Sequence, residues 1–299
     1  MQVSANGVRI EVDIRGPDSG EPLLMIMGLG MQLVAWPDGL VDELVAHGFR
    51  VIRFDNRDVG LSQPFDGLGV PSLPLAALLH TLHLPVKAPY QLADLARDAV
   101  GVLDALGIAK AHVCGASMGG MIAQHLGFAH ADRLKSLTLM MTSSGARSLP
   151  RESFKVRRVL MSRPRPGATP AQKLDNILDH FVRLYGVIGS PGYPPDATAL
   201  RTRIAVGVKR SFRPQAVARQ ILAIVADSRR AERLPRITAP TLVIHGEGDA
   251  LIPVAAAHDL ARRIPGARLE IIPGWGHDLP EALWPRLADE IARTAGVRP

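Results

Sequence analysis

Six residues near the middle of the chain, Gly115-Ala116-Ser117-Met118-Gly119-Gly120, place one serine among small neighbours. They follow the apolar run Ala111–Cys114 and precede a helical pattern, Met121–Leu126. This order predicts a strand, a sharp turn and a helix, because small residues let the backbone close on itself around the serine. The hydroxyl would lie beside free N–H groups at a helix N-terminus, which favour developing negative charge. We predict that Ser117 is a catalytic nucleophile.

A serine hydroxyl is a weak nucleophile, so it needs a base, and the base needs an orienting acid. In open parallel sheets the reactive groups collect at the C-terminal ends of the strands. Two late apolar runs end in Gly-rich loops of this kind: Thr241–His245 leads to Asp249, and Leu269–Ile272 leads to His277. Adjacent strands lie about 4.8 Å apart, so the two loops can bring a carboxylate to an imidazole. We therefore predict a catalytic triad of Ser117, His277 and Asp249.

Plainer interpretations compete with this triad. His277 could cap the helix that follows it, and Asp249 could be an ordinary turn residue. Glu247 shares the loop and is the rival acid, but the shorter Asp249 lies further beyond the strand. The alternation His245-x-Glu247-x-Asp249 also resembles a metal cluster. The loop glycines and the lack of a second histidine set argue against zinc, so we expect no metal and no cofactor.

Acyl transfer also requires two N–H donors for the oxyanion. Met118, the residue after the serine, supplies the first, and Leu29, in the loop after the first long apolar run, supplies the second. Gly28 lets this loop turn tightly. We predict that Gly28, Met31 and Trp36 contact the substrate, and the apolar character of this set favours an apolar acyl or alcohol group.

Apolar runs alternate with amphipathic stretches along the chain, which predicts βα units and a mainly parallel sheet with helices on both faces. The Asn6-Gly7 pair predicts a hairpin near the start. The expected strands are 23–27, 50–54, 112–114, 136–141, 241–245 and 269–272, and the expected helices are 38–47, 92–106, 118–128, 255–263 and 283–295. The alternation stops from about 144 to 234, which reads as helices broken by Pro and Gly. We predict a core of residues 1–143 and 235–299 and a helical cap of residues 144–234.

These motifs together resemble the α/β-hydrolase fold superfamily over nearly the whole chain. The residues that carry the resemblance are the elbow Gly115–Gln124, the Asp-x-Arg segment at Asp55, the Leu-Val-Ile-His-Gly-x-x-Asp segment ending at Asp249, and Gly-x-Gly-His at 274–277. The resemblance implies an α/β fold with a mostly parallel eight-stranded sheet, helices on both faces and an inserted helical cap. The stretch Met25–Ser62 looks like bacterial esterases related to the anthracycline methylesterases. Enol-lactone hydrolases, carbon–carbon hydrolases and cofactor-free haloperoxidase-like proteins have a similar elbow.

The chain departs from the family's usual pattern at two positions. Many relatives carry His-Gly where this chain has Met27-Gly28. The absence of that histidine removes a polar brace of the loop but leaves the backbone N–H donor. Asp58 stands where a glycine is common, and we interpret its neighbours Asp55 and Arg57 as structural braces. The nucleophile is a serine and not an aspartate, which argues against epoxide hydrolase and haloalkane dehalogenase chemistry.

Composition indicates what kind of protein this chain is. Of the 299 residues 47% are hydrophobic, which is ample for a core, and the single cysteine, Cys114, excludes an internal disulfide and is expected to be a small buried hydrophobe. The first residues do not read as a secretion signal, and the most apolar stretch, 22–36, is too short to span a bilayer. We expect a cytoplasmic protein with no membrane partner and leave its oligomeric state open.

Positive charge is concentrated in one part of the chain. Residues 147–233 contain 18 Lys and Arg against six Asp and Glu, a net charge of +12, whereas the remainder carries −5. The basic residues are mostly Arg at helical spacing with few aromatics, which favours a solvated helical face over a nucleic-acid surface. Acidic substrates or an anionic partner stay open as alternatives.

The combined motifs predict a serine carboxylesterase that takes a small-molecule ester and works through an acyl-enzyme. A lactone, thioester or carbon–carbon hydrolase could use the same triad, and a substrate panel would separate these reactions. A non-catalytic ligand-binding protein on the same fold is the alternative from a different class, which the intact triad argues against.

Overall fold

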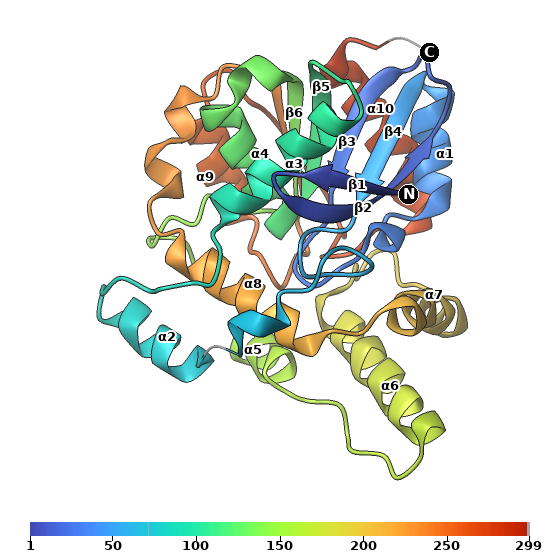
Figure 1. Ribbon diagram of the computed structural model, residues 1–299, viewed down its shortest axis with the longest axis vertical. Helices are drawn as coiled ribbons and strands as arrows, with labels where there is room; N and C mark the ends of the chain where they lie inside the picture. Colours follow the sequence, from blue (N-terminus) through green and yellow to red (C-terminus); the bar gives the residue numbers. More distant parts are fainter. Residues whose placement is uncertain (71, 298–299) are drawn as a thin grey trace.

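Eight strands form one twisted sheet in the order β1-β2-β4-β3-β5-β6-β7-β8 (Figure 1). The pairs β1–β2 and β2–β4 are antiparallel, and all other neighbours are parallel. The computed structural model describes residues 1–70 and 72–297. Its strands are β1 (Gln2–Ala5), β2 (Val8–Arg15), β3 (Glu21–Ile26), β4 (Phe49–Phe54), β5 (Ala111–Ala116), β6 (Leu134–Met140), β7 (Thr241–Gly246) and β8 (Arg268–Ile272).

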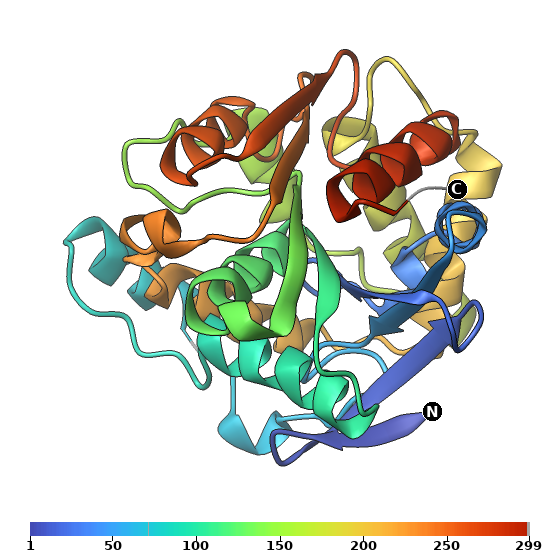
Figure 2. The same ribbon diagram turned by 90° about the horizontal axis from the view of Figure 1, so that it is seen from above.

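Helices cover both faces of this sheet (Figure 2). They are α1 (Asp38–Ala46), α2 (Leu73–Thr81), α3 (Leu92–Ala105), α4 (Met118–Ala129), α5 (Phe154–Leu160), α6 (Pro170–Ile188), α7 (Ala197–Arg210), α8 (Pro214–Ala226), α9 (Ala255–Arg263) and α10 (Trp284–Ala295), with short 3-10 turns such as η1 (Leu33–Ala35) between them. One core cluster joins the sheet to α3, α4 and α9, and the other joins it to α1 and α10. The predicted α/β-hydrolase architecture is therefore confirmed.

The six predicted strands are all present within two residues of their expected ends, and the five predicted helices within one. The expected hairpin is also present, because Asn6 adopts a φ of 52° and Gly7 a φ of 74° between β1 and β2. Both conformations are left-handed, which is why an Asn-Gly pair is favoured at such a turn. Local patterns in the chain were thus sufficient to find the elements of the sheet.

Four helices, α5 to α8, occupy the long connection between β6 and β7. Together with α2 they lie below the sheet in Figure 1, beyond the carboxyl ends of the parallel strands. Helix α6 packs against α5 and α7, and α8 packs against α2. No helix in residues 1–70 and 72–297 combines the length and the apolar character needed to cross a lipid bilayer.

Candidate active site

Ser117 lies at the sharp turn between β5 and α4, as the sequence predicts. Its backbone has a φ of 55° and a ψ of −120°, a conformation that costs a non-glycine residue about 1–3 kcal/mol. The surrounding structure holds this strain, because Ser117 N–H donates to the Met140 carbonyl at 3.0 Å and the Thr142 hydroxyl donates to the Ser117 carbonyl at 2.6 Å. A side chain at Gly119 would place its Cβ 1.9 Å from the carbonyl oxygen of Ile26, so only glycine fits there.

The structure brings Ser117, His277 and Asp249 together. His277 Nδ1 is 2.7 Å from Asp249 Oδ2, and His277 Nε2 is 3.0 Å from Ser117 Oγ. Because an ionised carboxylate only accepts hydrogen bonds, Nδ1 must carry the proton. Nε2 then has a free lone pair, so the imidazole is oriented to accept the proton of the Ser117 hydroxyl.

The backbone holds the Asp249 carboxylate in position. Its Oδ1 accepts from the N–H groups of Leu251 at 2.9 Å and Ile252 at 2.8 Å. Burial by itself would raise the pKa of this carboxyl, but the adjacent imidazoles of His277 and His245 hold the pKa well below its usual value. Asp249 is therefore a carboxylate at neutral pH and can stabilise a positive charge on His277.

The surroundings of Glu247 and His245 bear on two alternatives raised by the sequence, a different catalytic acid and a metal site. Glu247, the rival acid, is exposed, whereas Asp249 is buried against His277. His245 is fully buried and its Nε2–H donates to the Ile252 carbonyl at 2.8 Å, so it braces the acid loop. Among the described residues, no group of three or more His, Cys, Asp and Glu side chains could hold a metal ion.

The loop after β3 lies directly against the serine. A Cβ added at Gly28 would be 3.0 Å from Ser117 Cβ and 3.5 Å from Ser117 Oγ, so the absence of a side chain lets this loop approach. In residues 1–70 and 72–297, neither the N–H of Leu29 nor that of Met118 donates a hydrogen bond. Two unpaired N–H groups next to a nucleophile have the character of an oxyanion hole.

The two other predicted substrate contacts, Met31 and Trp36, lie in different surroundings. Met31 is half-buried and its N–H donates to the Gly28 carbonyl at 3.1 Å, so it belongs to the loop beside Ser117. Trp36 does not fit its prediction, because its side chain is fully buried in the core cluster that joins the sheet to α1 and α10. Its carbonyl accepts from Arg53 at 2.9 Å. The structure thus places Trp36 in the core and not at an entrance.

Asp55 and Arg57 are braces, as predicted. Asp55 accepts from the N–H of Leu33 at 2.7 Å and from that of Leu61 at 2.8 Å. The guanidinium of Arg57 makes two hydrogen bonds to the buried Asp98, at 2.5 and 2.6 Å. These contacts fix the loops that follow β3 and β4 at the edge of the sheet where Ser117 lies.

The sequence analysis missed several side chains that hold the site, all in the connection between β6 and β7. Gln220 of α8 is fully buried, and its Oε1 accepts from the N–H of Gly30 at 2.8 Å. The Ile188 carbonyl at the end of α6 accepts from His277 N–H at 2.8 Å, and the Ser190 hydroxyl accepts from Gly276 N–H at 2.9 Å. No local motif marks these residues, because each contact joins distant parts of the chain.

Asp58, at the position where relatives often have glycine, has a φ of 74° and is fully buried. Its carboxylate accepts from Arg219 of α8 at 2.6 and 2.9 Å and from the Tyr90 hydroxyl at 3.0 Å. Cys114 is buried in β5, as expected, and burial raises the pKa of its thiol to about 12. The thiol is therefore protonated and unreactive at neutral pH.

Comparison with known proteins agrees with this fold. The family model described as the alpha/beta hydrolase fold matches residues 21–176, more than half of the chain. The chain belongs to the α/β-hydrolase fold family. A second model, "Serine aminopeptidase, S33", matches residues 208–281, the part that contains Asp249 and His277.

Individual relatives cover almost the full length of the chain. Rhodomycin D methylesterase DnrP of Streptomyces peucetius is 32% identical, over 92% of this chain and 91% of the relative. A putative carbamate hydrolase, RutD of Variovorax paradoxus, is 28% identical over 90% of this chain and 89% of its own. The solved enol-lactonase from Burkholderia xenovorans LB400 has a TM-score of 0.70 at 21% identity and covers 99% of this chain and 100% of its own, a likeness of fold alone.

Proposed function

We propose that this protein is a serine carboxylesterase that hydrolyses esters of carboxylic acids through an acyl-enzyme. The observation that carries the proposal is the hydrogen-bonded series from Asp249 Oδ2 through His277 to Ser117 Oγ, at 2.7 and 3.0 Å. The similarity to enzymes named methylesterases supports an ester as the bond that is cleaved, in preference to a lactone, a thioester or a carbon–carbon bond. A methyl ester or another ester of a small alcohol is the substrate class that this similarity favours.

In the proposed acylation step, Ser117 Oγ attacks the ester carbonyl while His277 Nε2 takes its proton. The oxyanion that forms is stabilised by the N–H groups of Leu29 and Met118. The tetrahedral intermediate then expels the alcohol, to which His277 returns the proton. Asp249 keeps Nδ1 protonated and stabilises the imidazolium that exists during the transfer.

Deacylation repeats these roles with water as the nucleophile. His277 Nε2 takes a proton from the water as its oxygen attacks the acyl carbonyl, and the same two N–H groups hold the second oxyanion. The ester bond to Ser117 breaks, the serine regains its proton from His277, and the carboxylic acid leaves. Residues of this chain are sufficient for every proton transfer in the cycle.

We further propose that residues 144–234 form a cap over a core of residues 1–143 and 235–299. Three hydrogen bonds support the placement of the cap on the core. The Gln220 side chain accepts from Gly30 N–H, Arg210 donates to Asp55 at 2.7 Å, and the Ile188 carbonyl accepts from His277 N–H. Because the cap touches both the loop of Leu29 and the loop of His277, its helices are in a position to select the acyl or alcohol group. The half-buried Met31 also favours an apolar group there.

Replacement of the nucleophile tests the proposal. Ser117→Ala should lower kcat for a short p-nitrophenyl ester by at least about a thousandfold and abolish labelling by a fluorophosphonate probe. Ser143→Ala, which removes a nearby hydroxyl that has no place in the mechanism, is the matched control and should retain labelling. Full hydrolysis by Ser117→Ala would contradict the mechanism.

A further inference from the structure

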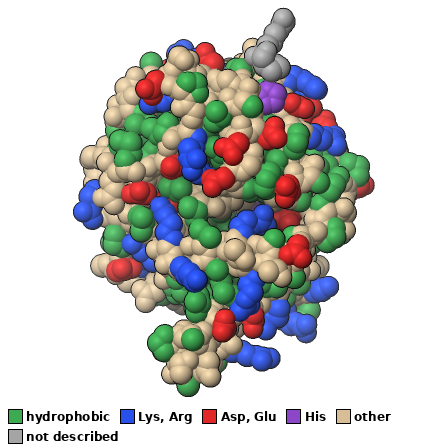
Figure 3. Space-filling view, turned by 90° about the vertical axis from the view of Figure 1, so that its right-hand side faces the viewer, with side chains coloured by type: hydrophobic (Ala, Val, Ile, Leu, Met, Phe, Trp, Pro, Cys, Tyr) green, Lys and Arg blue, Asp and Glu red, His purple; other side chains and the backbone are tan. Residues whose placement is uncertain are grey.

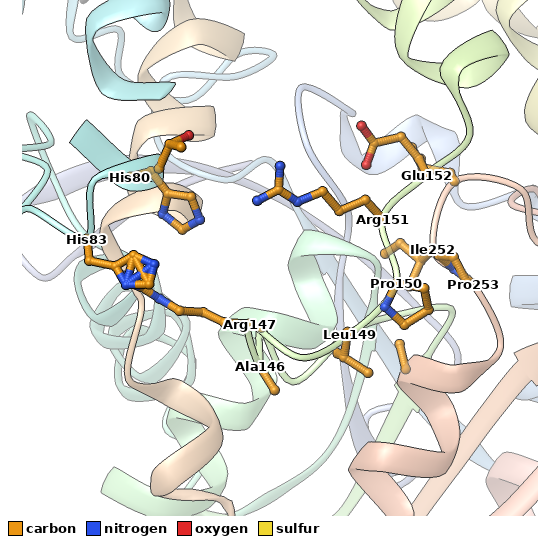
Figure 4. Close-up of a pocket in the computed structure, with 14 residues that line it drawn as sticks. His80, His83, Ala146, Arg147, Leu149, Pro150, Arg151, Glu152, Ile252 and Pro253 are labelled. Carbon is orange, nitrogen blue, oxygen red and sulfur yellow. The ribbon is translucent and has the colours of Figure 1, made fainter. Parts of the chain in front are cut away.

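A separate cleft of about 400 Å³ lies beside the ends of β6 and β7 (Figure 4). This volume is within the range of sites for small organic molecules. Its walls are the end of α2 with the turn after it, the loop 145–152 and the loop 251–256. Ser117 and His277 are not among its lining residues in the described part of the chain, so the cleft is distinct from the candidate active site.

Arginine side chains of one wall face histidine side chains of another across the cleft. Figure 4 shows the side chains of Arg147 and Arg151 extending toward His83 and His80 on the opposite wall. Burial, followed by the charges of Arg147 and Arg151, lowers the pKa of the His80 imidazole. The positive charges of both arginines therefore act on the same space between the walls.

These charges are uncompensated in the described structure. Among residues 1–70 and 72–297, neither Arg147 nor Arg151 forms a salt bridge. The carboxylate of Glu152, which also lines the cleft, is already engaged by Arg157 at 2.9 Å. Figure 3 shows the side of the molecule away from α2 and the cleft, where Lys and Arg are interspersed with Asp and Glu. Two arginines without a salt-bridge partner among the described residues thus line the cleft, within a segment of the chain that is already basic.

Most of the remaining lining residues are apolar, and hydrogen bonds hold one wall in place. Leu149, Ile252 and Pro253 contribute hydrocarbon surface to the walls. The N–H groups of Leu251 and Ile252 bond to the carboxylate of Asp249, which fixes this wall to the core. A preformed cavity that combines apolar surface with a few convergent charges has the character of a binding site.

We propose that this cleft binds a small organic anion, with an apolar body against Leu149, Ile252 and Pro253 and a carboxylate or phosphate group between Arg147 and Arg151. Guanidinium groups bind both kinds of anion through paired, charge-assisted hydrogen bonds. The cleft contains no Phe, Tyr or Trp among its lining residues, so it has no aromatic platform for the bases of a nucleic acid. The proposal does not depend on hydrolysis at Ser117.

Calorimetry with four probes separates the two features of the ligand. Octanoate and octyl phosphate carry both an apolar chain and an anionic group, octanol carries only the chain, and inorganic phosphate only the charge. At low salt, both octyl anions should bind at least about tenfold more tightly than octanol or inorganic phosphate. Raising the salt concentration should weaken both, since the contacts are partly exposed. The two octyl anions distinguish a carboxylate from a phosphate ligand.

Matched variants locate the site. Arg147→Gln/Arg151→Gln should weaken binding of the octyl anions by about tenfold or more. Arg163→Gln/Arg165→Gln makes the same change of charge at two exposed residues outside the cleft, and it should change binding by less than about twofold. His83→Asp is the second test. Its φ of 61° is one that aspartate tolerates, so the added negative charge should weaken binding without disturbing the fold.

Two results would overturn the proposal. One is equal binding of octanoate by both double variants, which would mean that the anion binds elsewhere. The other is equal binding of octanol and octanoate, which would leave an apolar groove without anion selectivity. Binding should be the same in Ser117→Ala and in the wild-type protein. A wild-type protein that binds the octyl anions but hydrolyses no ester would therefore count against the esterase proposal and not against this site.

Discussion

Gln220 accepts a hydrogen bond from the N–H of Gly30 at 2.8 Å, although 190 positions separate the two residues in the chain. The bond joins α8 to the loop that carries Leu29, one of the two proposed oxyanion donors. The amide nitrogen of Gln220 also lies 3.4 Å from the Arg57 carbonyl, so the side chain is held at both ends. The position of a backbone donor in the site thus depends on a buried side chain of a distant helix.

Gln220→Met should lower kcat for a neutral ester by about tenfold while KM changes little. Methionine has a similar length but cannot accept the hydrogen bond, so the loop of Leu29 loses its anchor. Removing a whole oxyanion donor costs about 100- to 1,000-fold in kcat, and a displaced donor should cost less. Steady-state kinetics with a p-nitrophenyl ester measures this, and Gln172→Met on the exposed face of α6 is the matched control. A value of kcat within twofold of the wild type would show that the bond does not position the donor.

Asp249→Asn should lower kcat by about a thousandfold or more near neutral pH. An amide can donate a hydrogen bond to His277 Nδ1 and so favours the tautomer with its proton on Nε2, which cannot accept from Ser117. Glu247→Gln changes the other acid of the same loop, and because that side chain is exposed its kcat should stay within about twofold. If Glu247→Gln were the impaired variant, the assignment of the acid would be wrong.

Asp249 should also make stability depend on pH. Its pKa is lowered in the folded protein, because His277 and His245 together outweigh the opposing effect of burial. A depressed folded pKa stabilises the protein above the pKa of the unfolded chain, about 3.9, and this contribution is lost as the pH falls through the folded pKa. Urea unfolding should therefore show a larger destabilisation by Asp249→Asn near pH 6 than near pH 3. Equal destabilisation at both pH values would mean that the pKa of Asp249 is not lowered.

The sheet and the three residues of the candidate triad could be predicted because their signals are local. The elbow needs Gly119 within two positions of Ser117, and Asp249 and His277 each follow a recognisable strand. The carboxyl ends of neighbouring parallel strands must meet at one edge, so topology alone brings such residues together. The same reasoning favoured Asp249 but kept Glu247 as a rival, and the structure separates the two acids, because Asp249 is buried against His277 at 2.7 Å whereas Glu247 is exposed.

The bracing contacts could not be predicted, because they depend on how distant helices pack. Nothing near Gln220 or Gly30 in the sequence marks them as partners. Trp36 shows the opposite error. From the sequence, an apolar residue shortly after the loop of Leu29 is equally compatible with a substrate contact and with the core. In the structure Trp36 is fully buried in the core. Composition cannot distinguish these cases, since both positions require the same kind of side chain.

The contributions of Asp58 and Arg219 to the free energy of unfolding should be strongly coupled. Both side chains are fully buried, and they are joined at 2.6 and 2.9 Å. Arg219→Met should lower the free energy of unfolding by about 3–5 kcal/mol, because it leaves the Asp58 charge buried without its main partner. Asp58→Asn removes that charge, so the double variant should be clearly less destabilised than the sum of the two single variants. Urea unfolding of all four proteins measures the coupling, and additive effects would show that Tyr90 and the backbone, and not Arg219, compensate the carboxylate.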